Sequence, residues 1–202
     1  MIITDKNKLK SKLEPRKMSK KDIDKISEQL LTELKKAGGL GLSANQIGLT
    51  DRVCLVNVTE PLILVNPRIV EVSKEAVAYV EQCLSLPKSM KKPVKTVRYK
   101  RITVECDNLG KVVFEPSKPT WESAEDFFSD EGMLECVCAQ HEIDHLNGIL
   151  ITDNSRRYTT TVTKKVQYSR NEKVMVKMPD GSTEFMKYKK AEPLLEMGAE
   201  IL

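Results

Sequence analysis

The chain contains only two histidines, and both lie in the five-residue segment His141-Glu142-Ile143-Asp144-His145. Residues at positions i and i+4 lie on one face of a helix, about 6 Å apart, so the two imidazoles are placed to share one metal ion. The intervening Glu142 can then act as a base beside that ion. The plain alternative is a core helix with two hydrogen-bonded histidines. That alternative is disfavoured, because unpaired polar groups cost free energy when they are buried.

A hydrolytic metal site needs a third protein ligand and an open position for water. No third histidine exists, which leaves a carboxylate or one of the cysteines: Cys54, Cys83, Cys106, Cys136 and Cys138. Cys54 and Cys106 lie in strand-like apolar runs and are typical of small buried hydrophobic residues. Cys138 is so near the histidines on the same helix that its ligand geometry is poor. Cys83 follows a strand-like run and precedes a proline, which places it at a strand end facing a helix.

The elements that position these residues are predicted from apolar periodicity. A helix is expected at about 130–147, capped by Asp130 or Ser129 and ended by Gly148. An earlier helix is expected at 19–37, where apolar residues recur at helical spacing before two glycines. Short strands are expected at 52–58, 62–72, 76–82, 96–106 and 111–115, with a hairpin turn at 107–110. The fold class is therefore α+β, with small antiparallel sheets packed around the late helix that carries the two histidines.

The segment 156–202 differs from the rest of the chain. It holds ten Lys or Arg against six Asp or Glu, whereas residues 1–155 have no net charge. Alternating residues at 174–178 and 185–188, separated by Pro179-Asp180-Gly181, predict a β-hairpin. We expect a domain at 1–155 and a basic, β-rich extension at 156–202. The basic excess is explained either by a solvated surface or by attraction to RNA, such as the ribosome surface.

Composition also limits the cellular compartments in which the protein is expected. No apolar run of 18 residues is present, so no membrane span or membrane partner is expected. The start of the chain lacks the pattern of a signal peptide. The number of cysteines is odd, five, and their spacing is not that of a disulfide scaffold, which favours a reducing, cytoplasmic environment.

Three blocks resemble motifs of the peptide deformylases and occur in that family's order. Residues 39–46, Gly-Leu-Gly-Leu-Ser-Ala-Asn-Gln, are similar to G-x-G-L-A-A-x-Q; residues 81–85, Glu-Gln-Cys-Leu-Ser, to E-G-C-L-S; and residues 140–146 to Q-H-E-x-D-H-L. The resemblance extends over about residues 1–153. Ser43 stands where the family usually has Ala, and Gln82 where it usually has Gly. Gln82 is expected to narrow the substrate groove or to alter substrate preference.

This resemblance implies a function and a metal site. The reaction is hydrolysis of the N-formyl group from the formyl-methionine that begins newly made polypeptides, with release of formate, which is a step of protein biosynthesis. One divalent ion is expected on Cys83, His141 and His145, with Fe²⁺ as the physiological ion and Zn²⁺, Ni²⁺ or Co²⁺ able to replace it. The setting is bacterial-type translation, in a cell, an organelle or a phage-infected cell.

The resemblance also implies roles for further residues. Glu142 is the expected general base and then general acid, while the Gln46 side chain and the Leu84 backbone N–H stabilise the oxyanion. The peptide is expected to pair with open backbone, and its binding residues are Gly39, Gly41, Leu42 and Gln82. Asp144 and Arg98 are expected to pair with each other next to the metal ligands and to help orient them without binding the metal.

Two other functions remain open at this point. A zincin-type metallopeptidase uses the same His-Glu-x-x-His, but it needs a downstream His or Glu, and the nearest is Glu172. A non-catalytic, metal-stabilised RNA-binding protein would use the basic extension. A structural metal site is usually closed by a fourth ligand and needs neither Glu142 nor Gln46, which argues against this second alternative.

Overall fold

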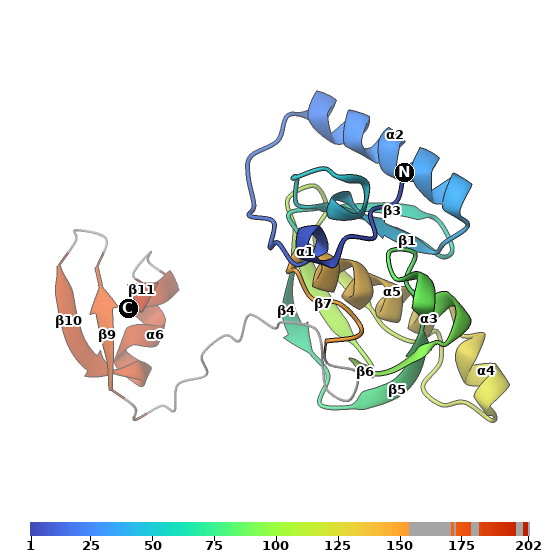
Figure 1. Cartoon of the computed structure of the whole chain (residues 1–202). Helices are drawn as coiled ribbons and strands as arrows, with labels where there is room; N and C mark the ends of the chain where they lie inside the picture. Colours follow the sequence, from blue (N-terminus) through green and yellow to red (C-terminus); the bar gives the residue numbers. More distant parts are fainter. Residues whose placement is uncertain (154–170, 172, 179–181, 197–199, 202) are drawn as a thin grey trace. The chain divides into compact units, whose positions relative to one another are not determined.

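The computed structural model describes residues 1–153, 171, 173–178, 182–196 and 200–201. The chain forms two compact units, residues 1–163 and 164–202 (Figure 1). The domain boundary expected after residue 155 lies outside the described residues.

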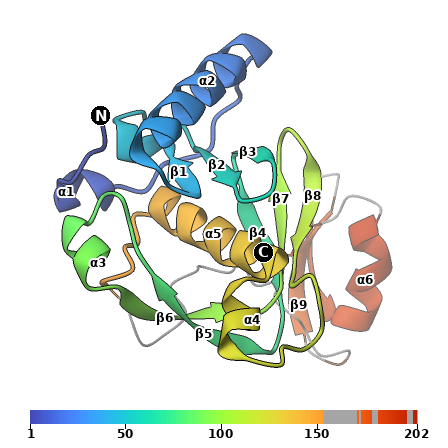
Figure 2. The same cartoon turned by 90° about the vertical axis from the view of Figure 1, so that its right-hand side faces the viewer.

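Helix α5, Glu131–Leu146, runs through the middle of the larger unit (Figure 2). The Asp130 side chain caps its first turn by accepting a hydrogen bond from the Met133 backbone N–H. The helix stops at Asn147, and the following Gly148 has a φ of 72°, a conformation that favours glycine. Nearly all of its residues from Met133 onward are buried, so α5 is a central core helix. The helix predicted at about 130–147 is confirmed.

Within the described residues, the larger unit has three antiparallel sheets around this helix. Their strand orders are β1-β2-β3, β4-β7-β8 and β5-β6. The strands are β1 (Gly41–Ser43), β2 (Val53–Asn57), β3 (Pro61–Val65), β4 (Arg68–Val72), β5 (Ala76–Glu81), β6 (Val94–Tyr99), β7 (Ile102–Cys106) and β8 (Gly110–Phe114). Helix α5 contacts strands of all three sheets, among them β2, β6 and β8. This arrangement confirms the α+β class.

Two of the predicted strands are each divided in the structure. The run 62–72 forms β3 and β4, which belong to different sheets. Asn66, between them, has a φ of 51°, and the following Pro67 has no N–H to donate to a ladder. The run 96–106 forms β6 and β7, and the Lys100 N–H between them donates to the Glu75 carbonyl instead of to a sheet partner.

Helix α2, Lys20–Ala37, lies on the outside of the β1-β2-β3 sheet (Figure 1). Ser19 caps it by accepting from the Asp22 N–H, and Gly38 ends it with a φ of 73°. Its buried stripe, Ile26, Leu30 and Leu34, packs on apolar side chains of the sheet. The helix predicted at 19–37 is confirmed. Five shorter elements of the larger unit were not predicted: α1 (Lys6–Leu9), β1 (Gly41–Ser43), the 3₁₀ helix η1 (Ala44–Ile47), α3 (Pro87–Lys91) and α4 (Ala124–Phe128).

The smaller unit contains strands β9 (Lys173–Lys177), β10 (Thr183–Lys187) and β11 (Glu200–Ile201), in the order β10-β9-β11. The two strands of the predicted hairpin are confirmed as the antiparallel pair β9 and β10. Its predicted turn, 179–181, lies outside the described residues. Helix α6, Tyr188–Glu196, packs against this pair and was not predicted.

None of the helices in the described part of the chain combines the length and apolarity that crossing a membrane requires.

Candidate metal centre

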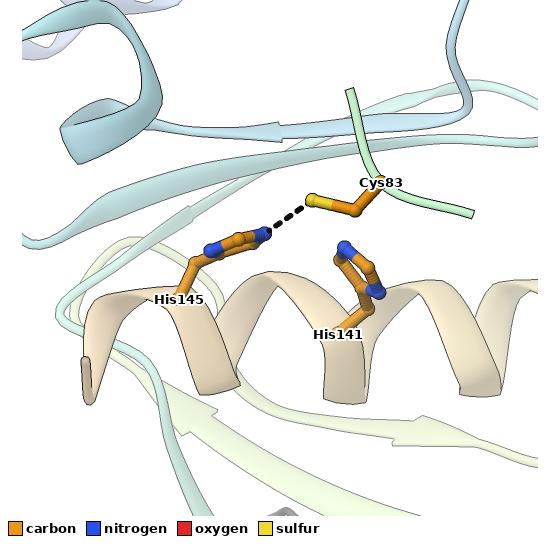
Figure 3. Close-up of side chains that lie close together, drawn as sticks. All are labelled: Cys83, His141 and His145. Carbon is orange, nitrogen blue, oxygen red and sulfur yellow. Dashed lines mark hydrogen bonds between the residues drawn. The ribbon is translucent and has the colours of Figure 1, made fainter. Parts of the chain in front are cut away.

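Three buried side chains converge between helix α5 and the segment after β5. His141 and His145 project from successive turns of α5, and Cys83 approaches them from the end of β5 (Figure 3). Their ligand atoms all lie within 4.8 Å of one another. The Cys83 Sγ is 3.2 Å from the His145 Nε2. The structure therefore brings together the three residues that the sequence singled out as metal ligands.

The donor set of this cluster suits a divalent transition-metal ion. One thiol and two imidazoles supply sulfur and nitrogen, which Zn²⁺ binds at about 2.0–2.3 Å and which Fe²⁺ also accepts. Donor atoms as close as those of Cys83 and His145 can share one ion with bonds of that length. Among the described residues, the group of candidate ligands has three members, and a catalytic ion of this type takes water in its fourth position. The residues present therefore fit a catalytic ion better than a closed structural one.

Behind the histidines lies a buried network of charged groups. The Glu81 carboxylate lies 2.7 Å from the His141 Nδ1 and accepts two hydrogen bonds from Arg98, at 2.6 and 2.8 Å. Arg98 also donates to Asp144 at 2.5 Å, which is the pairing expected from the sequence. Glu81 is the member that was not predicted. One feature of the sequence could have identified Glu81: it lies two residues before the candidate ligand Cys83, on the inward face of a strand.

This network determines which nitrogen of His141 is available to a metal ion. Burial acts to raise the pKa of Glu81, but Arg98 and His141 hold that pKa well below its usual range. Burial likewise acts to lower the pKa of Arg98, and Glu81 and Asp144 raise it above its usual value. Glu81 is thus a carboxylate that accepts the Nδ1–H of His141, leaving the Nε2 lone pair free for a ligand.

Glu142 lies on the side of α5 that faces β1, and its side chain is buried. Ser43 of β1 places its Oγ 2.6 Å from the Glu142 Oε2 and 2.9 Å from the Glu142 carbonyl oxygen. Burial raises the pKa of Glu142 above its ordinary value, although His141 and the Ser43 hydroxyl act in the opposite direction. A carboxylate with a raised pKa is suited to taking up a proton near neutral pH. Ser43 is a further contact of the site that the sequence did not identify.

Gly41 allows β1 and α5 to approach each other closely. A Cβ at this position would lie 2.6 Å from the Cys138 Sγ and 2.7 Å from the Glu142 Oε1. Both neighbours belong to α5 and are buried. A side chain at position 41 would therefore displace the Cys138 and Glu142 side chains from the positions they occupy.

Gln46 is oriented by two hydrogen bonds. Its Oε1 accepts from the Ser43 N–H at 2.8 Å, and its Nε2 donates to the Ser85 Oγ at 3.1 Å. The Nε2 lies 3.9 Å from the Cys83 Sγ. The expected oxyanion donor is therefore buried beside the expected ligand, and Leu84 follows that ligand directly in the chain.

A cavity of about 470 Å³ opens beside this cluster. Its lining includes the expected residues Gly39, Gly41, Gln46, Gln82, Cys83, Leu84, His141 and Glu142. Most other lining side chains are apolar: Leu40, Tyr79, Val80, Met90, Pro93, Leu134, Val137 and Cys138. The cavity joins the candidate ligands, the candidate base and an apolar recess in one site.

Two expected substrate-binding residues are placed differently from the others. The Leu42 side chain is fully buried under α2, because alternate residues of a strand face opposite sides, so it does not line the cavity. Gln82 is at the rim, where its side-chain amide donates to the Met90 carbonyl at 3.1 Å. Glu172, considered as the third ligand of a zincin, lies outside the described residues.

Comparison with known proteins places this geometry in a family. The sequence model of the polypeptide deformylases matches residues 1–161. The chain is 37% identical to the peptide deformylase of Rhizobium meliloti (strain 1021), covering 65% of this chain and 70% of that protein. It is 36% identical to the peptide deformylase of Carboxydothermus hydrogenoformans, covering 73% and 86%.

Solved structures agree with these sequence matches. A probable peptide deformylase from synechococcus phage S-SSM7 superposes with a TM-score of 0.61 at 29% identity, covering 76% of this chain and 97% of that chain. The peptide deformylase of Thermotoga maritima superposes with a TM-score of 0.61 at 28% identity, covering 76% and 95%.

Proposed function

The chain belongs to the peptide deformylase family, and from this premise we propose that Cys83, His141 and His145 hold its catalytic metal ion. The protein is a metal-dependent hydrolase that removes the formyl group from newly made polypeptides. The observation that supports the ligand assignment is the convergence of one thiol and two imidazoles beside a buried glutamate, at the wall of a cavity. The metal we propose is Fe²⁺, with Zn²⁺, Ni²⁺ or Co²⁺ able to replace it, since all four suit these donors.

When bound, a divalent ion at these ligands activates water at neutral pH and polarises the formyl carbonyl. Glu142 is the proton carrier of the reaction in this proposal. Its Oε2 is held by Ser43, whereas its Oε1 is directed toward Gly41 and the cavity. Glu142 takes a proton from the attacking water and delivers it to the amine that leaves. The products are formate and a polypeptide with a free α-amine.

We assign stabilisation of the tetrahedral oxyanion to Gln46 and Leu84. The Ser43 N–H fixes the Gln46 carbonyl oxygen, so the Gln46 Nε2 is directed toward Cys83 rather than away from it. The Leu84 backbone N–H comes from the residue after the ligand. Two donors held in advance lower the barrier, because no reorganisation is needed when charge develops.

The substrate is proposed to bind as an added strand between β1 and β5. Among the described strands β1 pairs only with β2, and β5 only with β6, so each has an edge available. Both edges contribute to the cavity lining, through Gly41 and through Val80 and Gln82. The apolar recess takes the methionine side chain. Gln82, which is hydrogen-bonded to the Met90 carbonyl, narrows the rim of the cavity. It thereby restricts which substrate residues can follow the formyl-methionine.

The remaining assignments follow from the sequence. We propose a catalytic domain at 1–155 and an accessory extension at 156–202, whose basic residues contact the ribosome. Formylated nascent chains occur where bacterial-type translation takes place, so we propose a cytoplasmic setting or its equivalent in an organelle or infected cell.

The experiment that tests this function is formate release from a formyl-Met-Ala-Ser peptide. Protein prepared without oxygen is loaded with Fe²⁺, Ni²⁺ or Zn²⁺ and compared with Glu142→Gln and Cys83→Ala. We expect turnover to fall by about 10²–10⁴-fold in Glu142→Gln with the metal retained, since general acid–base catalysis supplies about that much. We expect Cys83→Ala to lose the metal. Metal retention by Cys83→Ala would contradict the ligand set, and undiminished turnover by Glu142→Gln would contradict the role of the base.

A further inference from the structure

The sheet of the smaller unit has one covered face and one open face. Val174, Val176 and Met186 point to the covered face, where they pack with Ala191 of α6. Because side chains alternate along a strand, the intervening residues of β9 and β10 point to the opposite face. We call this opposite face the open face; its residues are Lys173, Met175, Lys177, Thr183, Phe185 and Lys187.

The open face consists of three cross-strand pairs. In register, Lys173 lies opposite Lys187, Met175 opposite Phe185, and Lys177 opposite Thr183. All six side chains are exposed, and the two large apolar ones are 41% (Met175) and 60% (Phe185) exposed. The Lys173 Nζ lies 5.8 Å from the centre of the Phe185 ring. An aromatic ring beside a thioether thus forms an uncovered apolar centre with lysines at both ends.

The charges on this face favour an anionic partner. Like charges directly opposite each other destabilise a strand pair, and Lys173 and Lys187 form such a pair. None of the six residues is acidic; Glu184 of β10 is in register with the buried Val176, and therefore belongs to the other face. Among the described residues of this face, two of the three lysines, Lys173 and Lys187, therefore lie together at one end of the strand pair.

We propose that the open face binds single-stranded RNA, with a base stacked on Phe185 and phosphates beside Lys173 and Lys187. The proposal rests on the proposed contact between the extension and ribosomal RNA, and it identifies the surface that makes it. Sites for single-stranded nucleic acid combine an exposed aromatic ring with cations in this way, because every base has a face that stacks and every nucleotide has a charge. An acidic peptide would account for the lysines but leave the exposed ring without a role.

The test is fluorescence anisotropy of a labelled 12-residue oligouridine with the full chain, over a range of salt concentrations. We expect Phe185→Ala to weaken binding about tenfold, and Phe185→Tyr to restore it, because stacking needs a ring but not this particular one. The double variant Lys173→Gln, Lys187→Gln should reduce the slope of log Kd against log salt by about 1.4, which is about 0.7 for each phosphate contact with a single strand.

Matched controls lie in the larger unit. Lys20 and Lys21 are exposed on α2, and Phe128 is an exposed ring on α4, so Lys20→Gln with Lys21→Gln, and Phe128→Ala, should leave binding unchanged. Formate release is measured on every preparation, so loss of deformylation is distinguished from loss of RNA binding. The proposal is overturned if the oligouridine does not bind, if Phe185→Ala binds it normally, or if oligoglutamate binds as tightly.

Discussion

At the scale of single residues, Ser43 makes two contacts with Glu142 that its one hydroxyl proton cannot serve together. The hydroxyl can donate to the Oε2 of an ionised Glu142. Once Glu142 carries a proton, the hydroxyl can accept from the carboxyl group and donate to the Glu142 carbonyl oxygen. Ser43 can thus form a hydrogen bond with Glu142, the proposed base, whether Glu142 is ionised or protonated. The Ala that peptide deformylases usually have at this position could not.

We expect Ser43→Ala to lower kcat about tenfold and to leave KM nearly unchanged. The lost hydrogen bond to a charged group is worth about 1.5–3 kcal/mol, part of which is realised only while Glu142 moves the proton. Steady-state kinetics with the formylated tripeptide measure both constants. The control is Ser27→Ala. Ser27 lies on α2, its hydroxyl donates to the Ile23 carbonyl oxygen, and it does not line the cavity. An unchanged kcat would show that Glu142 does not depend on this hydroxyl.

In the proposed metal site, Glu81 acts on the ion through its hydrogen bond with His141 and is not itself a ligand. Replacement by Gln keeps the shape but removes the charge that holds the His141 Nδ1–H and two Arg98 donors. We expect Glu81→Gln to weaken metal affinity about 10–100-fold, as is usual for groups that orient a ligand. Competition with a chelator measures this directly. The partly exposed Glu105, paired with Arg68, gives the control Glu105→Gln, and equal affinities in the two variants would contradict the role of Glu81.

At the scale of elements, α5 depends on its first turn. Asp130 accepts hydrogen bonds from the Met133 and Ser117 backbone N–H groups and from the Trp121 indole. Burial acts to raise the pKa of Asp130, but these hydrogen bonds lower it below its ordinary value. A depressed pKa means that the carboxylate stabilises the fold above its unfolded pKa, near 4, and that this contribution is lost as the pH falls through the folded pKa.

We therefore expect Asp130→Ala to lower the free energy of unfolding by about 1–2 kcal/mol at pH 7, in the range for loss of a helix cap. The difference from the unchanged protein should shrink below pH 4 and disappear at lower pH. Urea denaturation at a series of pH values measures this. A difference that stays constant down to pH 2 would show that packing, not the carboxylate, is responsible.

The two long helices could be predicted because each combines a cap, a periodic stripe and a terminating glycine. The divided strands could not be located as well. The break at Asn66-Pro67 has a local signal, but the break near Lys100 has none, since its backbone partner Glu75 is distant in sequence. Apolar alternation continues through such a break, so only tertiary pairing shows where one sheet ends and another begins.

In the site, too, some residues could be predicted from the local sequence, whereas others depend on contacts between distant parts of the chain. Cys83, His141 and Glu142 have chemistry that is visible in isolation, and the structure places them together. Glu81 and Ser43 are ordinary residues until a second element is placed against them, 60 and 99 positions away. Leu42 was expected at the cavity because it belongs to a motif, but its side chain packs under α2. Membership of a motif does not specify to which side of a strand a side chain points.

At the scale of the whole molecule, all three candidate ligands belong to the larger unit, residues 1–163. The smaller unit has its own apolar cluster around Val174 and Val176. An ion that binds only the folded larger unit stabilises that unit by about 2.7 kcal/mol when its free concentration is 100 times its Kd. The effect of metal removal should therefore be confined to one part of the chain.

Hydrogen exchange measured by mass spectrometry can locate this effect. Addition of a chelator should accelerate exchange of amides in α5 and β5, and should leave β9 and β10 unchanged. The Cys83→Ala variant serves as the control, because it should exchange at the faster rate with or without chelator. Equal acceleration in both units would show that the ion stabilises the chain as one cooperative whole.

The available edge of β1 has a consequence for the behaviour of the protein in concentrated solution. A strand edge that accepts a substrate by backbone pairing can accept a strand from another copy, and long open edges promote aggregation for this reason. β1 is only three residues long, from Gly41 to Ser43. So short an edge offers a few hydrogen bonds at most, enough to align the first residues of a nascent chain. The brevity of β1 therefore limits how strongly this edge can pair with a strand of another copy.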